Sequence, residues 1–183
     1  MSSNTKELYL SIIDQTVFRQ YLRHLFIFPF KDISYAVDAL HNLRTGLSRT
    51  LQQYPFLAGT VKVADASSGV LKATYPEPIR QDYGDIMLST SHALAANAKF
   101  DYYTLEKAGF PPAMLPAFAF CPIGLRNHAG LDDPYAKLGA SAAKGYRIPI
   151  MCAQATFIPG GLVLSVYAHH SVVDGGAVDK IYE

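Results

Sequence analysis

The sequence lacks tryptophan and has only two cysteines, Cys121 and Cys152, among its 183 residues. Two cysteines cannot build a disulfide scaffold and are too few for the usual thiolate zinc site. The polar first residues are not followed by the apolar core of a signal peptide. We therefore expect a protein of a reducing compartment, the cytoplasm, with no metal and no disulfide.

The chain also lacks an excess of positive or negative charge. Lys and Arg total 16 and Asp and Glu total 15, which gives a formal net charge of +1. A balanced charge provides no electrostatic footprint for nucleic acid or for an anionic membrane, so neither is expected as a partner. Half of the residues are hydrophobic, which is typical of a globular domain that buries a core.

One long stretch, residues 148–173, carries no Lys, Arg, Asp or Glu. Its length could span a bilayer, but Pro159, Gly160 and Gly161 interrupt it with a turn signal. Each flanking arm is too short for a membrane helix. The stretch therefore predicts a buried hairpin made of residues 148–158 and 162–168.

Apolar runs bounded by turn residues predict further strands, at residues 7–13, 22–28, 57–63 and 70–75. Between the second and third of these runs, leucines recur at spacings of three and four, which predicts a helix. Asp32 or Ser34 can cap this helix, and Pro55 ends it.

The pattern weakens over residues 76–146, where glycine, alanine and proline dominate and mostly irregular structure is expected. A final helix is predicted to begin near Gly176 and to be still running at Glu183. We therefore expect the chain to stop within a structural element and to be part of a larger protein.

The strongest chemical signal is the string His169-His170-Ser-Val-Val-Asp174-Gly175-Gly176. His170 ends an apolar strand and opens a glycine-containing turn, where a rigid scaffold can hold an imidazole as a general base near pH 7. Asp174, four residues later, can brace the turn or order a distant cation. A second His-x-x-x-Asp pattern, at His128 and Asp132, has no flanking strand and indicates a solvated loop histidine.

At these residues the sequence resembles the BAHD family of CoA-dependent acyltransferases, and within it the fungal trichothecene 3-O-acetyltransferase-like members. Three other stretches share the resemblance, in the same order: residues 10–15, residues 51–59 with Tyr54-Pro55-Phe-Leu-Ala-Gly59, and residues 154–164. The resemblance implies an α/β fold with a two-layer mixed β-sheet flanked by helices, similar to chloramphenicol acetyltransferase, as one of two similar domains.

The resemblance also implies a mechanism. His170 would remove a proton from an acceptor hydroxyl or amine, and the acceptor would attack an acyl-CoA directly, with acetyl-CoA the leading candidate. Asp174 would be structural and paired with an arginine, Gly175 would match the family's glycine, and His169 would support the site. No Gly-x-Ser-x-Gly nucleophile pattern occurs in the sequence, so no acyl-enzyme is expected.

The chain departs from the family in length, because family members are more than twice as long. Their second half carries an Asp-Phe-Gly-Trp-Gly motif and most CoA contacts, and this sequence has no Trp. We therefore expect residues 1–183 to be the N-terminal acyltransferase domain. Its expected partners are the C-terminal CoA-binding half, in the same enzyme or as a separate chain, and a small-molecule acceptor.

Two other functions remain open. Condensation domains of peptide synthetases share the His-His-x-x-x-Asp-Gly pattern and take acyl groups from a carrier protein. A repurposed member of the fold could instead bind a metabolite without acyl transfer. The Tyr54–Gly59 passage and residues 11–15 favour the BAHD interpretation. Acetyl-CoA turnover by the complete protein separates the three functions.

Overall fold

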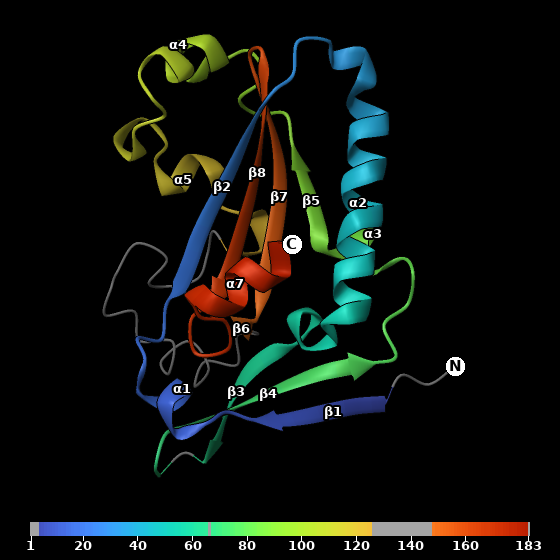
Figure 1. The fold of residues 1–183 in the computed structure, drawn as a ribbon, viewed down its shortest axis with the longest axis vertical. Coiled ribbons are helices and arrows are strands. Elements are labelled where there is room, and N and C mark those ends of the chain that lie inside the picture. The colour runs from blue at the N-terminus through green and yellow to red at the C-terminus, as the bar shows by residue number, and fades with distance from the viewer. Residues whose placement is uncertain (1–3, 66, 126–147, 183) are drawn as a thin grey trace.

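The computed structural model describes residues 4–65, 67–125 and 148–182, and their strands form two four-stranded sheets. In Figure 1 one sheet runs along the long axis of the molecule and the other crosses below it. This arrangement is the α/β fold with two sheet layers and flanking helices that the sequence predicts.

The smaller sheet is antiparallel and has the order β1-β4-β3-β6. Its strands are β1 (Asn4–Tyr9), β3 (Thr60–Asp65), β4 (Val70–Glu77) and β6 (Ile148–Pro149). The predicted hairpin of residues 57–63 and 70–75 is confirmed as β3 and β4, except that residues 57–59 precede β3, in and just after a 3-10 turn. The predicted strand 7–13 is wrong in its second half, where the short helix α1 (Ile12–Thr16) begins instead.

Two side chains explain why α1 replaces the end of the predicted strand. Ser11 caps the helix with its hydroxyl at the Asp14 backbone N–H, and the Asp14 carboxylate accepts the Ser11 backbone N–H in return. This reciprocal pair is a capping box. Gln15 then uses both ends of its amide to bond the backbone N–H and carbonyl of Leu71, which ties α1 to β4.

The larger sheet has the order β2-β8-β7-β5. Its strands are β2 (Tyr21–Pro29), β5 (Leu88–Ser91), β7 (Met151–Ile158) and β8 (Gly161–His169). β2, β8 and β7 pair antiparallel, whereas β5 pairs parallel to β7, so the sheet is mixed. The apolar hairpin is confirmed as β7 and β8, except that Ile148 and Pro149 belong to β6 in the other sheet.

Helix α2 (Ala36–Gln53) lies beside β5 and β7 and matches the predicted leucine-rich helix. Asp32 caps a preceding 3-10 turn (Ile33–Tyr35) by accepting the Ser34 N–H. A second 3-10 turn (Pro55–Ala58) follows α2. Leu51 is fully buried, but the Val37 side chain is 76% exposed, so the helix buries only its leucine face.

Residues 76–125 are more regular than predicted, because they form β5 and three short α-helices between their irregular segments. These helices are α3 (Tyr83–Met87), α4 (Tyr102–Lys107) and α5 (Ala117–Phe120). α4 and α5 pack a second apolar cluster, with Leu105 and Phe120 fully buried, against Val163 on the face of the sheet opposite α2. Figure 1 shows both helices on the side of the sheet away from α2.

The last helix, α7 (Gly175–Tyr182), confirms the predicted helix near Gly176. It follows β8 directly and lies near the lower end of the long sheet in Figure 1. Among the described helices, none has the length and apolar character that crossing a membrane requires.

Candidate functional site

The His-His turn continues the large sheet by one further hydrogen bond. His169 is the last residue of β8 and pairs with Tyr21 of β2. The His170 backbone N–H donates to the Gln20 carbonyl at 2.8 Å, and the His169 N–H donates to the Ile150 carbonyl at 2.8 Å. The backbone on both sides of the His170 Cα is therefore fixed by neighbouring chain segments.

The carbonyl of His169 closes the turn that follows. It accepts the backbone N–H groups of Val172 at 2.9 Å and Val173 at 3.0 Å. The imidazole of His169 adds a third bond, because its Nδ1 accepts the Ser171 N–H at 3.2 Å. One residue thus holds the three positions after His170, which leaves the His170 side chain on a rigid backbone.

His169 itself is fully buried. Its ring lies edge-on to Tyr21, with centroids 5.5 Å apart. Burial is the main cause that lowers the pKa of His169 to about 4, and the charges of Arg19 and His170 contribute to the same shift. The imidazole is therefore neutral at pH 7, with Nδ1 free of a proton and able to accept from Ser171.

His170 is only partly buried, unlike its neighbour. Its Nδ1 is shielded from solvent and has no hydrogen-bond partner among the described residues. The burial of Nδ1 leaves Nε2 as the candidate ring nitrogen for proton transfer. A fixed backbone and a partly exposed imidazole suit a general base.

Asp174 is exposed and begins helix α7. Its Oδ1 accepts the Ala177 N–H at 2.7 Å, and its backbone carbonyl accepts the Val178 N–H at 3.0 Å. The resemblance implies a pairing with an arginine, but Asp174 forms no ion pair with any described residue. In this structure Asp174 acts as the helix cap, and its carboxylate also suits the positive end of the helix dipole.

The Tyr54–Gly59 passage connects to the His-His turn through Ile150. Ile150 donates its N–H to the Gly59 carbonyl at 3.0 Å and accepts the His169 N–H with its own carbonyl. Gly59 is required at its position, because a Cβ there would lie 2.5 Å from the Thr74 carbonyl oxygen. Tyr54 reaches α7, with its hydroxyl 3.4 Å from the Lys180 carbonyl oxygen.

Several residues that support this site were not found from the sequence. Tyr21 packs on His169, donates its hydroxyl to the Pro149 carbonyl at 2.7 Å, and has its pKa raised chiefly by burial. Gln20 holds the His170 N–H through its backbone alone, which leaves no signature in its side chain. The Ser-x-x-Asp spacing at Ser11 and Asp14 is the one signal that could have identified α1.

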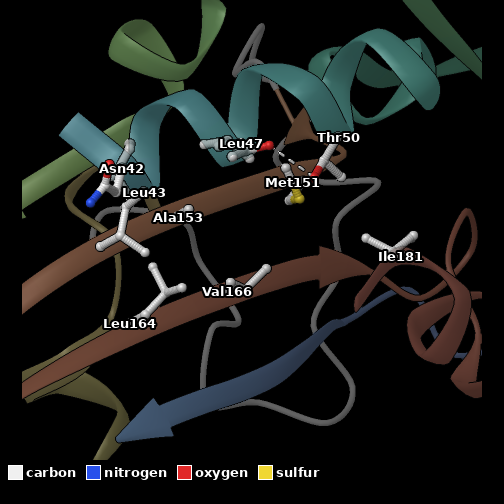
Figure 2. Close-up of a pocket in the computed structure, with 11 residues that line it drawn as sticks. Asn42, Leu43, Leu47, Thr50, Met151, Ala153, Leu164, Val166 and Ile181 are labelled. Atoms are coloured by element: carbon white, nitrogen blue, oxygen red, sulfur yellow. Dashed lines mark hydrogen bonds between the residues drawn. The ribbon is translucent and has the colours of Figure 1, made fainter. Parts of the chain in front are cut away.

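Two cavities lie near the large sheet, and neither has His170 or Asp174 in its lining. One, of about 700 Å³, lies between the smaller sheet and the β5–β7 edge, with Gly59, Tyr83 and Cys152 in its wall. The other, of about 230 Å³, lies between α2 and β8 (Figure 2). The structure describes no group of three or more His, Cys, Asp or Glu side chains that could hold a metal ion. His128 and Asp132 lie outside the described residues.

The known sequences that resemble this chain include fungal acetyltransferases. It is 28% identical to the trichothecene 3-O-acetyltransferase of Fusarium sporotrichioides, over 98% of this chain and 37% of that protein. It is 26% identical to an eremophilane O-acetyltransferase of Penicillium roqueforti, over 93% of this chain and 33% of that protein. The chain thus spans about a third of the length of these relatives.

Solved structures agree on the fold. The crystal structure of apo TRI101 from F. graminearum superposes with a TM-score of 0.74 at 20% identity, over 98% of this chain and 38% of that one. TRI101 from F. sporotrichioides, solved with coenzyme A and T-2, gives a TM-score of 0.71 at 24% identity, over 96% and 36%. The family described as the trichothecene 3-O-acetyltransferase-like N-terminal domain matches residues 20–182. The chain therefore belongs to the trichothecene 3-O-acetyltransferase-like N-terminal domain family.

Proposed function

We propose that this chain is the N-terminal, histidine-bearing domain of an acyltransferase that moves an acyl group from acyl-CoA to a small natural product. The observation that carries the proposal is the placement of His170. Its backbone is bonded to Gln20, the turn after it is closed by His169, and its partly exposed ring has a buried Nδ1, which makes Nε2 the proposed proton acceptor.

The proposed reaction is a direct transfer. His170 Nε2 takes the proton of an acceptor hydroxyl or amine while the acceptor atom attacks the thioester carbonyl. The carbon–sulfur bond then breaks, and the CoA sulfur leaves with the proton that His170 returns. A base held in place typically contributes about 10²–10⁴-fold to such a reaction.

His169 and Asp174 have positioning roles in this proposal. The neutral His169 ring and its carbonyl hold the turn, and Asp174 caps α7 directly behind it. Neither group needs to touch a substrate. His170 is therefore the base, and Asp174 contributes by fixing the backbone on which His170 sits.

The relatives support a choice of donor and acceptor. Their names describe acetyltransferases, and one related structure holds coenzyme A and the mycotoxin T-2. We propose acetyl-CoA as donor and an apolar small molecule with a free hydroxyl as acceptor. The relatives' extra length supplies the C-terminal half, which would bind CoA and cover His170. We place the enzyme in the cytoplasm.

The test uses the complete enzyme that contains this domain, with acetyl-CoA and candidate alcohols or amines, and follows thiol release. His170→Ala should lower the rate about 10²–10⁴-fold. The matched control is His41→Ala, which removes an exposed imidazole from α2. Equal activity of the two variants would remove His170 from the mechanism.

The same assay separates the alternative functions. Turnover with a carrier-bound acyl group but not with acetyl-CoA would identify a condensation-type catalyst. Acceptor binding without any thiol release would identify a repurposed, non-transferring member of the fold.

A further inference from the structure

The segment between α1 and β2, residues 17–20, carries the carbonyl that holds the His170 backbone. The Gln20 carbonyl accepts the His170 N–H at 2.8 Å, one position beyond the last pair of the β2–β8 ladder, which is Tyr21 with His169. Residues 17–20 themselves belong to no helix or strand. The position of the Gln20 carbonyl therefore depends on the contacts that hold this segment against the rest of the fold.

Gln15, near the end of α1, holds the start of the segment on the smaller sheet. Its Nε2 donates to the Leu71 carbonyl at 2.8 Å, and its Oε1 accepts the Leu71 N–H at 2.9 Å. β1 ends just before this point, where Tyr9 pairs with Lys72. The Gln15 amide thus takes the two backbone groups of β4 that a further residue of β1 would bond. Leu71 is 4% exposed and belongs to the main core, so this contact is anchored in a rigid part of the fold.

Arg19, directly before Gln20, holds the end of the segment on the turn between β3 and β4. Its Nη2 donates to the Gly69 carbonyl at 2.7 Å. Gly69 has a φ of 69°, a conformation that favours glycine, and a Cβ there would lie 3.9 Å from both terminal nitrogens of Arg19. The guanidinium therefore lies against the Gly69 backbone. Figure 1 shows α1 beside this end of the smaller sheet, below the start of β2.

The Gly69 carbonyl is a fixed acceptor because Asp65 holds the turn. The Asp65 carbonyl accepts the Gly69 N–H at 2.8 Å, and its carboxylate accepts the N–H of Ser67 and the hydroxyls of Ser67 and Ser68. The hydrogen bonds from Ser68 and Ser67 lower the pKa of Asp65 to about 2. The carboxylate therefore stays ionised, and keeps these bonds, in the neutral and mildly acidic range.

We propose that Gln15 and Arg19 are positioning residues for His170, and we call their two contacts the Gln15–Arg19 clamp. The clamp holds residues 17–20 against β4 and the turn before it, so that the Gln20 carbonyl fixes the His170 backbone from which the imidazole projects. Neither side chain needs to touch a substrate. The inference rests on the proposed function, in which His170 is the base.

The clamp gives a role to the stretch from Ser11 to Gln15, which the general-base assignment alone leaves unexplained. The capping box of Ser11 and Asp14 forms α1, and α1 presents the Gln15 amide to β4. Small displacements matter at a catalytic base, because a shift of about 1 Å can lower a rate on the order of 100-fold. A contact remote from the substrate can therefore control the rate through the backbone.

The kinetic test uses the complete enzyme with acetyl-CoA and the alcohol acceptor found in the thiol-release assay. Arg19→Met and Gln15→Leu remove the bonds to Gly69 and Leu71. Each should lower kcat about 10-fold and change KM by less than about 2-fold, since a displaced base weakens the transition state more than substrate binding. Arg19→Lys keeps a donor for the single bond to Gly69 and should recover most of the lost kcat. An unchanged kcat in both variants would overturn the proposal.

The matched control is Ser48→Ala, which also removes two hydrogen bonds. The Ser48 hydroxyl donates to the Gln81 carbonyl at 2.7 Å and accepts the Gly84 N–H at 2.9 Å, and neither bond involves residues 15–20. Ser48→Ala should lower Tm without lowering kcat at a temperature where the enzyme is folded. An equal loss of kcat in this control would assign the effect to lost stability. A loss confined to Arg19→Met would assign it to the charge of Arg19, and either result would overturn the clamp.

Backbone hydrogen exchange provides a readout that does not depend on acyl transfer. Mass spectrometry of peptides that contain His170 measures its amide, which is bonded to Gln20 in the parent. Arg19→Met and Gln15→Leu should speed this exchange about 10-fold, whereas the amide of Val166 in the middle of β8 should keep its rate. Unchanged exchange at His170 would refute the clamp, whereas an active His170→Ala variant would refute the proposed function, so the two failures are distinguishable.

Discussion

The backbone N–H of His170 donates to the carbonyl of Gln20, 2.8 Å away, just beyond the last paired residues of β2 and β8. His170 therefore belongs to the sheet by its backbone even though its side chain lies at the start of a turn. The segment that supplies Gln20 also carries Arg19, which bonds the Gly69 carbonyl in the β3–β4 turn. The segment that holds the His170 backbone is thus also bonded to the smaller sheet's β3–β4 turn.

Replacement of Asp174 should affect stability through the helix cap. Asp174→Ala should lower the free energy of unfolding by about 1 kcal/mol, because it removes the acceptor for the Ala177 N–H. Asp174→Asn keeps an acceptor and is a good cap, so it should lose much less. Urea unfolding of both variants measures the difference. A loss for Asp174→Asn as large as that for Asp174→Ala would instead indicate that the negative charge is needed.

His169 should make stability depend on pH. Its pKa is about 4 when folded and about 6.5 in the unfolded chain, so between these values the unfolded chain binds a proton that the folded chain does not. The stabilisation is complete above pH 6.5 and is lost as the pH falls to 4. The difference corresponds to about 3 kcal/mol.

The control for this dependence is His169→Asn, whose amide oxygen can replace Nδ1 as the acceptor for Ser171 but does not titrate. The free energy of unfolding should fall less steeply between pH 6.5 and 4 in this variant than in the parent. Parallel curves for the two proteins would show that His169 does not contribute.

Direct transfer predicts that no acyl group becomes attached to the protein. Cys121 is fully buried, and burial raises the pKa of Cys152 to about 12, so neither offers a thiolate at neutral pH. Intact mass spectrometry after mixing the enzyme with acetyl-CoA alone should show the unmodified mass. A stoichiometric acetyl adduct on Cys152 would replace the direct mechanism with a two-step one.

The sequence predicted the elements that have strong local patterns. Leucine spacing predicted α2, and the apolar arms around Pro159 and Gly160 predicted β7 and β8. The short strand β5 was missed because its four residues take their structure from parallel pairing with β7, more than 60 residues later in the chain. A pairing partner so distant leaves no periodic signal within the strand itself.

The sequence predicted which residues form the candidate site, but not how buried or exposed their side chains are. The motif identified His170 and placed it at a strand end, and the structure has it there. The burial of His169 depends on its register with Tyr21, which no local pattern encodes. The exposed, capping role of Asp174 could have been read from its position one residue before α7, since Asp is a preferred cap.

Replacing Gly84 or Gly46 by alanine should change the stability of the fold in opposite directions, because the two glycines have different surroundings. Gly84 of α3 packs on α2, where its N–H donates to the Ser48 hydroxyl at 2.9 Å and a Cβ would collide with the Arg44 carbonyl oxygen. Since that obstacle is backbone, Gly84→Ala should cost about 1–3 kcal/mol. Gly46→Ala on the same helix pair meets open space and should stabilise the isolated chain by up to about 1 kcal/mol. Thermal unfolding of both variants should therefore shift Tm in opposite directions, and a lower Tm for Gly46→Ala would mean that the space around Gly46 is not open.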